Sequence, residues 1–151
     1  MKEILTAPFM TETVRTLTNM YAHGWDERNG GNVSLLLDGK EIEDYLDPKA
    51  VLRQIPLGFS APQLAGKVFL VTGTGKYFKN VQYDPENNLG IIRIGDSGEN
   101  AGLLWGYRDG GKMTSEFPAH MMSHIARLGT DPENRVIMHC QIGRASCRER
   151  V

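Results

Sequence analysis

The chain has 151 residues and a formal net charge of −1; 40% of its residues are hydrophobic and 23% are charged. This composition is typical of a single globular domain, excludes a disordered or fibrous chain, and gives no reason to expect a nucleic-acid partner. No apolar run approaches the roughly 18 residues of a membrane span, and the N-terminal decapeptide does not resemble a signal peptide. Because two cysteines cannot make a disulfide framework, we expect a cytoplasmic protein without a membrane partner.

The first predicted element is an amphipathic helix over 8–24, in which apolar residues recur at helical spacing and Gly24 is the expected stop. A short strand is predicted over 32–39. The segment 41–56 is polar and irregular and is predicted to be a short helix followed by a loop. The continuous apolar run over 67–75 predicts a strand that ends in a Gly-rich turn.

The second part of the chain is predicted to hold a hairpin, a helix and a last strand. The hairpin strands lie within 88–98 and 102–111, and the helix over 114–129 has Ser or Thr caps, an early Pro and a following Gly. The last strand covers 135–140. Strands interleaved with few helices predict an α/β sandwich with a mixed or largely antiparallel sheet.

The sequence GWDERNGGN, residues 24–32, is the first candidate ligand site. Gly30 and Gly31 stand between Asn29 and Asn32, where the helix gives way to the strand. Glycines let the backbone approach a ligand, consecutive N–H groups can bind an anion, and Asn amides add uncharged donors. The alternative is a loop that only needs positive φ, which Asn and Gly both tolerate.

The sequence VTGTGKYF, residues 71–78, resembles a P-loop only superficially. Leu70 stands where that motif needs Gly, and Tyr77 stands where it needs Ser or Thr. A nucleoside triphosphate site is therefore not expected. A smaller phosphate held by Thr74 and the Gly75 N–H, or an ordinary turn at a strand end, remain as interpretations.

The sequence TSEFPAH, residues 114–120, opens a helix. Thr114 and Ser115 could bind a phosphate there or could simply cap the helix. Glu116 is favoured in the first turn by the helix dipole, and it becomes a candidate general base if this end of the helix faces a cleft.

Three histidines near the C-terminus are candidate metal ligands. His120 and His124 share a helix face at i, i+4, but without an HExxH pattern we expect one of them to pack as a hydrogen-bonded core or interface histidine rather than to bind a metal. In the last strand His139 and residue 141 point to one face. Gln141 is a poor zinc ligand, so the chain offers one ligand there and no second.

These motifs together resemble the class II sugar-phosphate aldolases of the aldolase/adducin fold. The segments that carry the resemblance, from about Met10 to Cys140, are GWDERNGGN, TGTGK-F, NLGI, LLWG, TSE-PAH and RVIMHC. The resemblance is closest to family members that act on L-rhamnulose 1-phosphate. It implies a three-layer α/β/α sandwich with a central mixed, mostly antiparallel sheet.

The resemblance also implies a zinc enzyme that cleaves L-rhamnulose 1-phosphate to dihydroxyacetone phosphate and L-lactaldehyde, as a homotetramer with one zinc ion per subunit. Glu116 matches the catalytic acid/base and His139 the first zinc ligand. Other matched positions would hold the substrate phosphate and the backbone around it: Asn29, Asn32, Thr74, Gly75, Thr114 and Ser115.

The decapeptide from Ile142 to Val151 has no periodicity and matches a translated short-read sequencing adapter. We therefore expect residues 1–141 to be the N-terminal part of one class II aldolase domain and residues 142–151 to be a non-native tail. Similar proteins read His-x-His in this strand, so Gln141 would replace a histidine whose codon was cut after its first base. Such a chain would hold one zinc ligand of three, and we expect it to be inactive and to fold poorly.

Two other functions remain open. A fuculose- or ribulose-phosphate aldolase or epimerase shares the fold and would change only the substrate. A non-catalytic, adducin-like binding module would lack the metal. A histidine at position 141 with another downstream would favour the enzyme, whereas a native Gln would favour the binding module.

Overall fold

A computed structural model describes residues 1–26 and 30–140 of the chain. Its helices and strands, in chain order, are η1 (Ile4–Thr6), α1 (Pro8–Ala22), β1 (Asn32–Leu37), α2 (Gly39–Ile42), β2 (Arg53–Pro56), η2 (Pro62–Leu64), β3 (Val68–Thr72), η3 (Phe78–Asn80), α3 (Pro85–Asn88), β4 (Leu89–Ile94), β5 (Asn100–Gly106), α4 (Phe117–Thr130) and β6 (Val136–His139).

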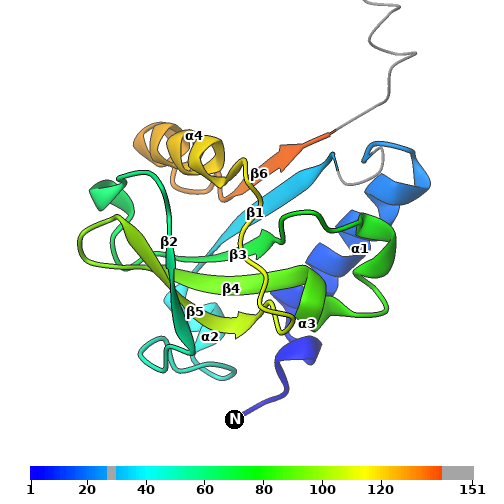
Figure 1. Cartoon of the computed structure of the whole chain (residues 1–151), viewed down its shortest axis with the longest axis horizontal. Helices are drawn as coiled ribbons and strands as arrows, with labels where there is room; N and C mark the ends of the chain where they lie inside the picture. The colour runs from blue at the N-terminus through cyan, green and yellow to red at the C-terminus, as the bar shows by residue number, and fades with distance from the viewer. Residues whose placement is uncertain (27–29, 141–151) are drawn as a thin grey trace, which may run out of the picture.

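The strands form one sheet in the order β2-β5-β4-β3-β1-β6 (Figure 1). Every pairing between the described strands is antiparallel. All five residues of β3 are buried, as the continuous apolar run predicts for a strand in the middle of a sheet. The predicted α/β class and the predicted β4–β5 hairpin are confirmed.

Two cores lie on the two faces of this sheet, because successive strand residues point to opposite sides. On one face Leu17 of α1 belongs to the same buried cluster as Val33 and Leu70. On the other face Phe117 of α4 belongs to a cluster with Phe69. Figure 1 shows α1 and α4 on opposite sides of β1. The expected helix–sheet–helix layering follows from this arrangement.

The segment 41–56 is predicted to be a short helix followed by a loop; α2 reaches into its start, but the loop prediction is wrong at its end. Arg53–Pro56 forms the edge strand β2 and pairs with β5. Only Ile55 of these four residues is buried, so the sequence has no alternating apolar signal for the strand. Pro56 fits an edge strand, where one N–H needs no partner in the sheet.

Both long helices lie close to where the sequence predicts them. α1 ends at Ala22, and Gly24 takes a φ of +72°, which confirms it as the stop. α4 begins at Phe117, with Glu116 as its N-cap and a Pro in the first turn. The helix therefore starts three residues later than predicted, and Thr114 and Ser115 lie in the segment that leads into it. The predicted Ser or Thr cap is wrong because Glu116 holds the N-cap position, and the predicted stop is wrong because Gly129 lies inside the helix, which ends at Thr130.

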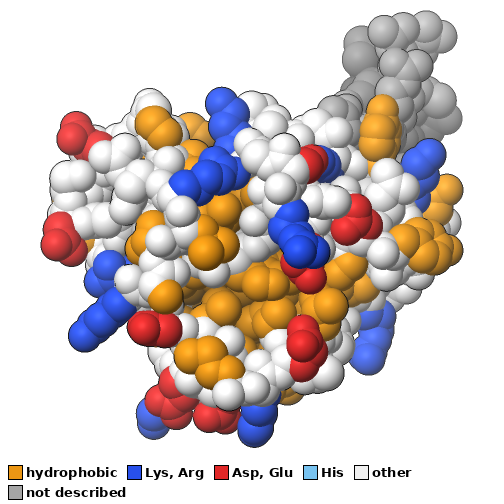
Figure 2. Space-filling view, turned by 60° about the horizontal axis from the view of Figure 1, so that its bottom comes forward, with side chains coloured by type: hydrophobic (Ala, Val, Ile, Leu, Met, Phe, Trp, Pro, Cys, Tyr) orange, Lys and Arg blue, Asp and Glu red, His pale blue; other side chains and the backbone are white. Residues whose placement is uncertain are grey.

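Hydrophobic side chains reach the surface on one face of the molecule. Figure 2 shows them gathered at the centre of that face, with Lys, Arg, Asp and Glu side chains around them. Contiguous exposed apolar surface favours association with other protein surfaces. Among the residues that the structure describes, no helix has both the length and the apolar character to cross a bilayer.

Candidate active site

The candidate site lies where β1 begins, β6 ends and α4 begins. Asn32, the first residue of β1, is the register partner of His139, the last residue of β6. Antiparallel pairing puts the start of one strand beside the end of the other. Glu116 caps α4 and reaches both residues, although 84 residues separate it from Asn32.

Glu116 and His139 are in direct contact and remain open to a ligand. The Nδ1 atom of His139 lies 3.0 Å from Oε2 of Glu116, and it lies 3.3 Å from Nδ2 of Asn32. The Asn32 amide nitrogen donates to the same carboxylate oxygen. The side chains of His139 and Glu116 are 42% and 46% exposed, whereas Asn32 is buried. A buried amide thus holds an accessible carboxylate beside an accessible imidazole.

Backbone hydrogen bonds join the TGTGK turn to the TSE segment. The Thr74 N–H donates to the Lys112 carbonyl and the Thr114 N–H donates to the Thr72 carbonyl, both at 2.9 Å. The Thr114 hydroxyl accepts from the Glu116 N–H at 3.3 Å, which supports the turn that presents Glu116. The two segments that the sequence suggested as phosphate sites therefore lie side by side next to the candidate base.

The predicted phosphate ligands differ in accessibility. Asn32 and Thr114 are buried, and the Asn32 amide contacts Glu116 and His120 instead of facing solvent. Thr74 is half-buried, and Gly75 and Ser115 are exposed. Gly75 has a φ of +70°, which favours glycine at this turn. Asn29 lies outside the described residues. Thr74, Gly75 and Ser115 can therefore meet a ligand from solvent, and their role in binding phosphate stays a prediction.

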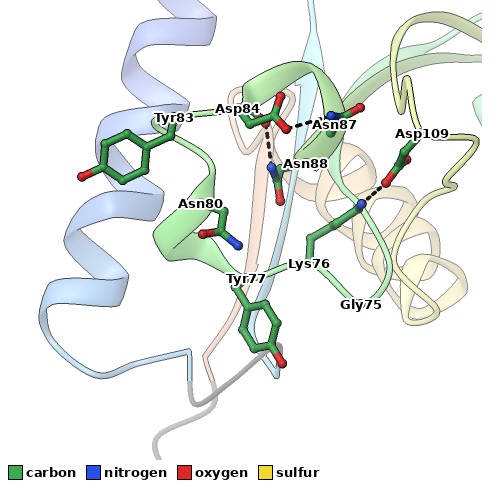
Figure 3. Close-up of a pocket in the computed structure, with 9 residues that line it drawn as sticks. All are labelled: Gly75, Lys76, Tyr77, Asn80, Tyr83, Asp84, Asn87, Asn88 and Asp109. Atoms are coloured by element: carbon green, nitrogen blue, oxygen red, sulfur yellow. Dashed lines mark hydrogen bonds and ion pairs between the residues drawn. The ribbon is translucent and has the colours of Figure 1, made fainter.

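A polar pocket of about 500 Å³ lies beside this turn (Figure 3). Figure 3 shows Lys76 extended towards Asp109, and Asp84 hydrogen-bonded to Asn87 and through its carbonyl to Asn88. The hydrogen bond from Lys76 lowers the pKa of Asp109 below its usual value. Because Asp109 neutralises the Lys76 ammonium, this pocket does not offer the lysine as a free phosphate ligand.

The described residues do not form a metal site by themselves. Within residues 1–26 and 30–140, no group of three His, Cys, Asp or Glu side chains could hold an ion. His139 fits a zinc ligand because its imidazole is accessible and its Nδ1 faces a carboxylate, which can fix the tautomer and leave the other nitrogen free. A catalytic zinc site needs about three protein ligands, and residue 141 lies outside the described part of the chain.

His120 and His124 are not near-surface ligands but a buried pair. The Ser34 hydroxyl lies 2.6 Å from Nδ1 of His120 and 2.8 Å from Nε2 of His124. Burial lowers the pKa of both imidazoles to about 4. The prediction that one of them is a hydrogen-bonded core histidine is therefore confirmed, and the structure extends it to both.

Two residues around the site, Ser34 and Asp26, escaped the sequence reasoning, and a third, Gly31, has a different role from the one considered. Ser34 reads as an ordinary strand residue, yet it joins two histidines. Burial raises the pKa of Asp26, partly opposed by a backbone hydrogen bond from Phe78. A Cβ on Gly31 would lie 3.0 Å from Cβ of Asp26 and 3.2 Å from the His139 carbonyl, so Gly31 serves close packing rather than positive φ. An Asp inside the GWDERNGGN motif was the one available signal for Asp26.

Comparison with known proteins identifies a family. Residues 11–146 match the family described as Class II Aldolase and Adducin N-terminal domain. Rhamnulose-1-phosphate aldolases of Listeria innocua, Enterococcus faecalis and Escherichia coli are 60%, 57% and 44% identical over 92%, 90% and 93% of this chain. The matches cover 51%, 49% and 52% of those relatives, so the chain spans about half the length of the curated relatives it matches.

A solved structure agrees with the sequence comparisons. The crystal structure of a sugar-phosphate aldolase from Thermotoga maritima superposes with a TM-score of 0.66 at 28% identity. The superposition covers 87% of this chain and 53% of that one.

Proposed function

Because this chain belongs to the class II aldolase and adducin N-terminal domain family, we propose that it forms the half of an L-rhamnulose-1-phosphate aldolase that carries the catalytic carboxylate. The observation that carries the proposal is the contact of Glu116 with His139 at 3.0 Å. It joins a candidate acid/base to a candidate metal ligand in an accessible site, and both residues match the family motifs.

The proposed reaction is retro-aldol cleavage of L-rhamnulose 1-phosphate into dihydroxyacetone phosphate and L-lactaldehyde. The C4 hydroxyl loses a proton, the C3–C4 bond breaks, and C3 of the resulting enediolate gains a proton. Glu116 would move the proton at C3, since its carboxylate is exposed while Asn32 donates to it from the buried side. The proton released at C4 balances the proton taken up at C3.

The resemblance implies zinc, and zinc bound by His139 together with imidazoles from beyond the described residues would supply a Lewis acid at the ketone and hydroxyl oxygens. The side chains of Thr74, Ser115, Thr114 and Asn29, with the Gly75 N–H, would hold the phosphate. Uncharged donors suit a phosphate that must be released after each turnover. We also propose that the complete enzyme is a homotetramer in the cytoplasm.

The test uses a protein in which residues 1–140 of this chain are joined to the C-terminal half of the Listeria innocua relative, here called the joined protein. We expect the joined protein to cleave L-rhamnulose 1-phosphate, to prefer it to L-fuculose 1-phosphate and to ribulose phosphates, and to lose activity on exhaustive chelation. Zinc should restore it.

Two results would reject the proposal. Preference for another sugar phosphate would assign a different member of the family. A folded joined protein that binds the sugar phosphate but never cleaves it would favour the non-catalytic module. Circular dichroism and gel filtration on the joined protein separate either result from a failure to fold.

A further inference from the structure

A series of buried, hydrogen-bonded polar side chains, here called the polar series, runs from the interior of the molecule to Glu116. His124 lies beside Ser34, Ser34 beside His120, and His120 beside Asn32, whose amide contacts Glu116. These contacts join α4 to β1 across 86 to 90 residues of sequence. His120 is 3% exposed, and Ser34 and His124 are both 0% exposed, so water does not compete for these hydrogen bonds.

The Glu116 carboxylate at the outer end of the polar series sets the direction of every hydrogen bond in it. An ionised carboxylate only accepts, so Asn32 must turn its amide nitrogen towards Glu116 and its carbonyl oxygen towards His120. Nε2 of His120 must then carry a proton and donate it to Oδ1 of Asn32. In a neutral imidazole the other nitrogen is an acceptor, so the Ser34 hydroxyl donates to Nδ1 of His120. The remaining Ser34 lone pair accepts from Nε2–H of His124.

His124, at the inner end of the polar series, is consistent with these hydrogen-bond directions. Nδ1 of His124 is the buried side-chain atom among the described residues that has no hydrogen-bond partner. With the hydrogen bonds oriented as derived above, this nitrogen carries a lone pair and no proton. The imidazole also packs against Phe69, with ring centroids 4.8 Å apart. The polar series therefore ends in an apolar environment without burying an unpaired N–H group.

We propose that His120 and Ser34 are positioning residues, which lock the Asn32 amide so that its nitrogen, and not its oxygen, faces Glu116. A flipped amide would put an oxygen against the carboxylate and push Glu116 away from the place where it reaches substrate. The assignment of a catalytic role to Glu116 rests on the function proposed above, whereas the orientation of the amide does not.

The orientation is tested in the joined protein by NMR of its imidazole and side-chain amide nitrogens. We expect His120 and His124 to be neutral with the proton on Nε2, and the exposed His23 gives the internal reference. Ser34→Ala and His120→Phe should shift the Asn32 amide signals, and His120→Gln should restore them because its amide N–H can donate to Oδ1. A proton on Nδ1 of His120, or Asn32 signals unmoved by both Ser34→Ala and His120→Phe, would overturn the proposal.

The consequence for catalysis is tested in the joined protein with L-rhamnulose 1-phosphate. Ser34→Ala and His120→Phe should lower kcat about 10- to 100-fold, as changes behind a catalytic group do, with KM within about twofold. His120→Gln should regain most of the loss, and His23→Gln serves as a matched control with unchanged kinetics. If His120→Gln is as slow as His120→Phe, His120 acts through packing alone and the proposal fails. An inactive parent protein with the expected tautomers would instead reject the proposed function and leave the orientation standing.

Discussion

The buried imidazoles of His120 and His124 make stability depend on pH. Their pKa is about 4 in the folded chain, below the ordinary value near 6.5. The unfolded chain therefore binds more protons between these two values, so the free energy of unfolding falls as the pH drops from about 6.5 towards 4. A shift of this size corresponds to at most about 3 kcal/mol for each imidazole.

Urea unfolding of the joined protein at pH 7.5 and pH 5 measures this dependence. We expect the joined protein to lose stability over that interval and its His124→Gln variant to lose less, because one of the two buried bases is gone. His23→Gln, which changes an exposed histidine, should behave like the parent. Equal losses in all three proteins would show that these imidazoles do not set the pH dependence.

Gly31 is a second residue whose effect can be measured. Gly31→Ala would push its Cβ against Asp26 and the His139 carbonyl, and overpacking of this kind costs roughly 1–3 kcal/mol. In the joined protein it should also weaken zinc binding, because His139 would shift. Gly39→Ala is the matched control, since nothing lies within 4 Å of its Cβ. Equal stability of the two variants would contradict the packing argument.

At the scale of the elements, β6 carries His139 into the site, and side-chain hydrogen bonds from Arg135 hold the start of this strand. Arg135 donates to both carboxylate oxygens of Glu41, at 2.7 and 3.3 Å, and to the Leu36 carbonyl at 3.3 Å. Burial raises the pKa of Glu41, but hydrogen bonding and charge from Arg135 outweigh it, so the pKa lies below the ordinary value. The pair ties the start of β6 to α2 and β1.

Glu41→Gln should therefore destabilise the chain by about 1 kcal/mol, as expected for a partly exposed but bidentate pair. Hydrogen exchange should rise in β6 more than in β3. Asp44→Asn, which breaks the exposed pair with Lys2, should change neither quantity. Protection of β6 that survives Glu41→Gln would show that the strand is held by its pairing with β1 alone.

The elements also show which parts of the fold can be read from sequence. The run Val68–Thr72 is buried on both faces and identifies a central strand by itself, and the Pro in the first turn of α4 identifies the start of that helix. β2 has only Ile55 as a buried residue, so its position depends on pairing with β5, which local pattern does not encode. The contact of Asn32 with His120 likewise depends on where α4 crosses β1, so sequence could supply the residues but not the hydrogen bonds between them.

For the whole molecule, exposed apolar side chains should govern behaviour in solution. Val136 and Met138 are about half exposed on β6, and β6 pairs on only one side among the described strands. An unpaired, apolar strand edge favours aggregation. We expect the 151-residue chain to bind a hydrophobic dye and to elute from gel filtration as polydisperse aggregates, and the joined protein to do neither. A monodisperse chain that leaves the dye free would contradict this expectation.

The molecule's central feature is an accessible carboxylate on the cap of α4, held by a buried amide beside the imidazole that ends β6. Its proposed task is to move one proton at the carbon next to the ketone. The most direct measurement is deuterium exchange from D₂O into C3 of dihydroxyacetone phosphate, catalysed by the joined protein. Glu116→Gln should slow this exchange by roughly 10²- to 10⁴-fold while the zinc content stays that of the parent. Exchange at the parental rate in Glu116→Gln would contradict the assignment of Glu116 as the proton carrier.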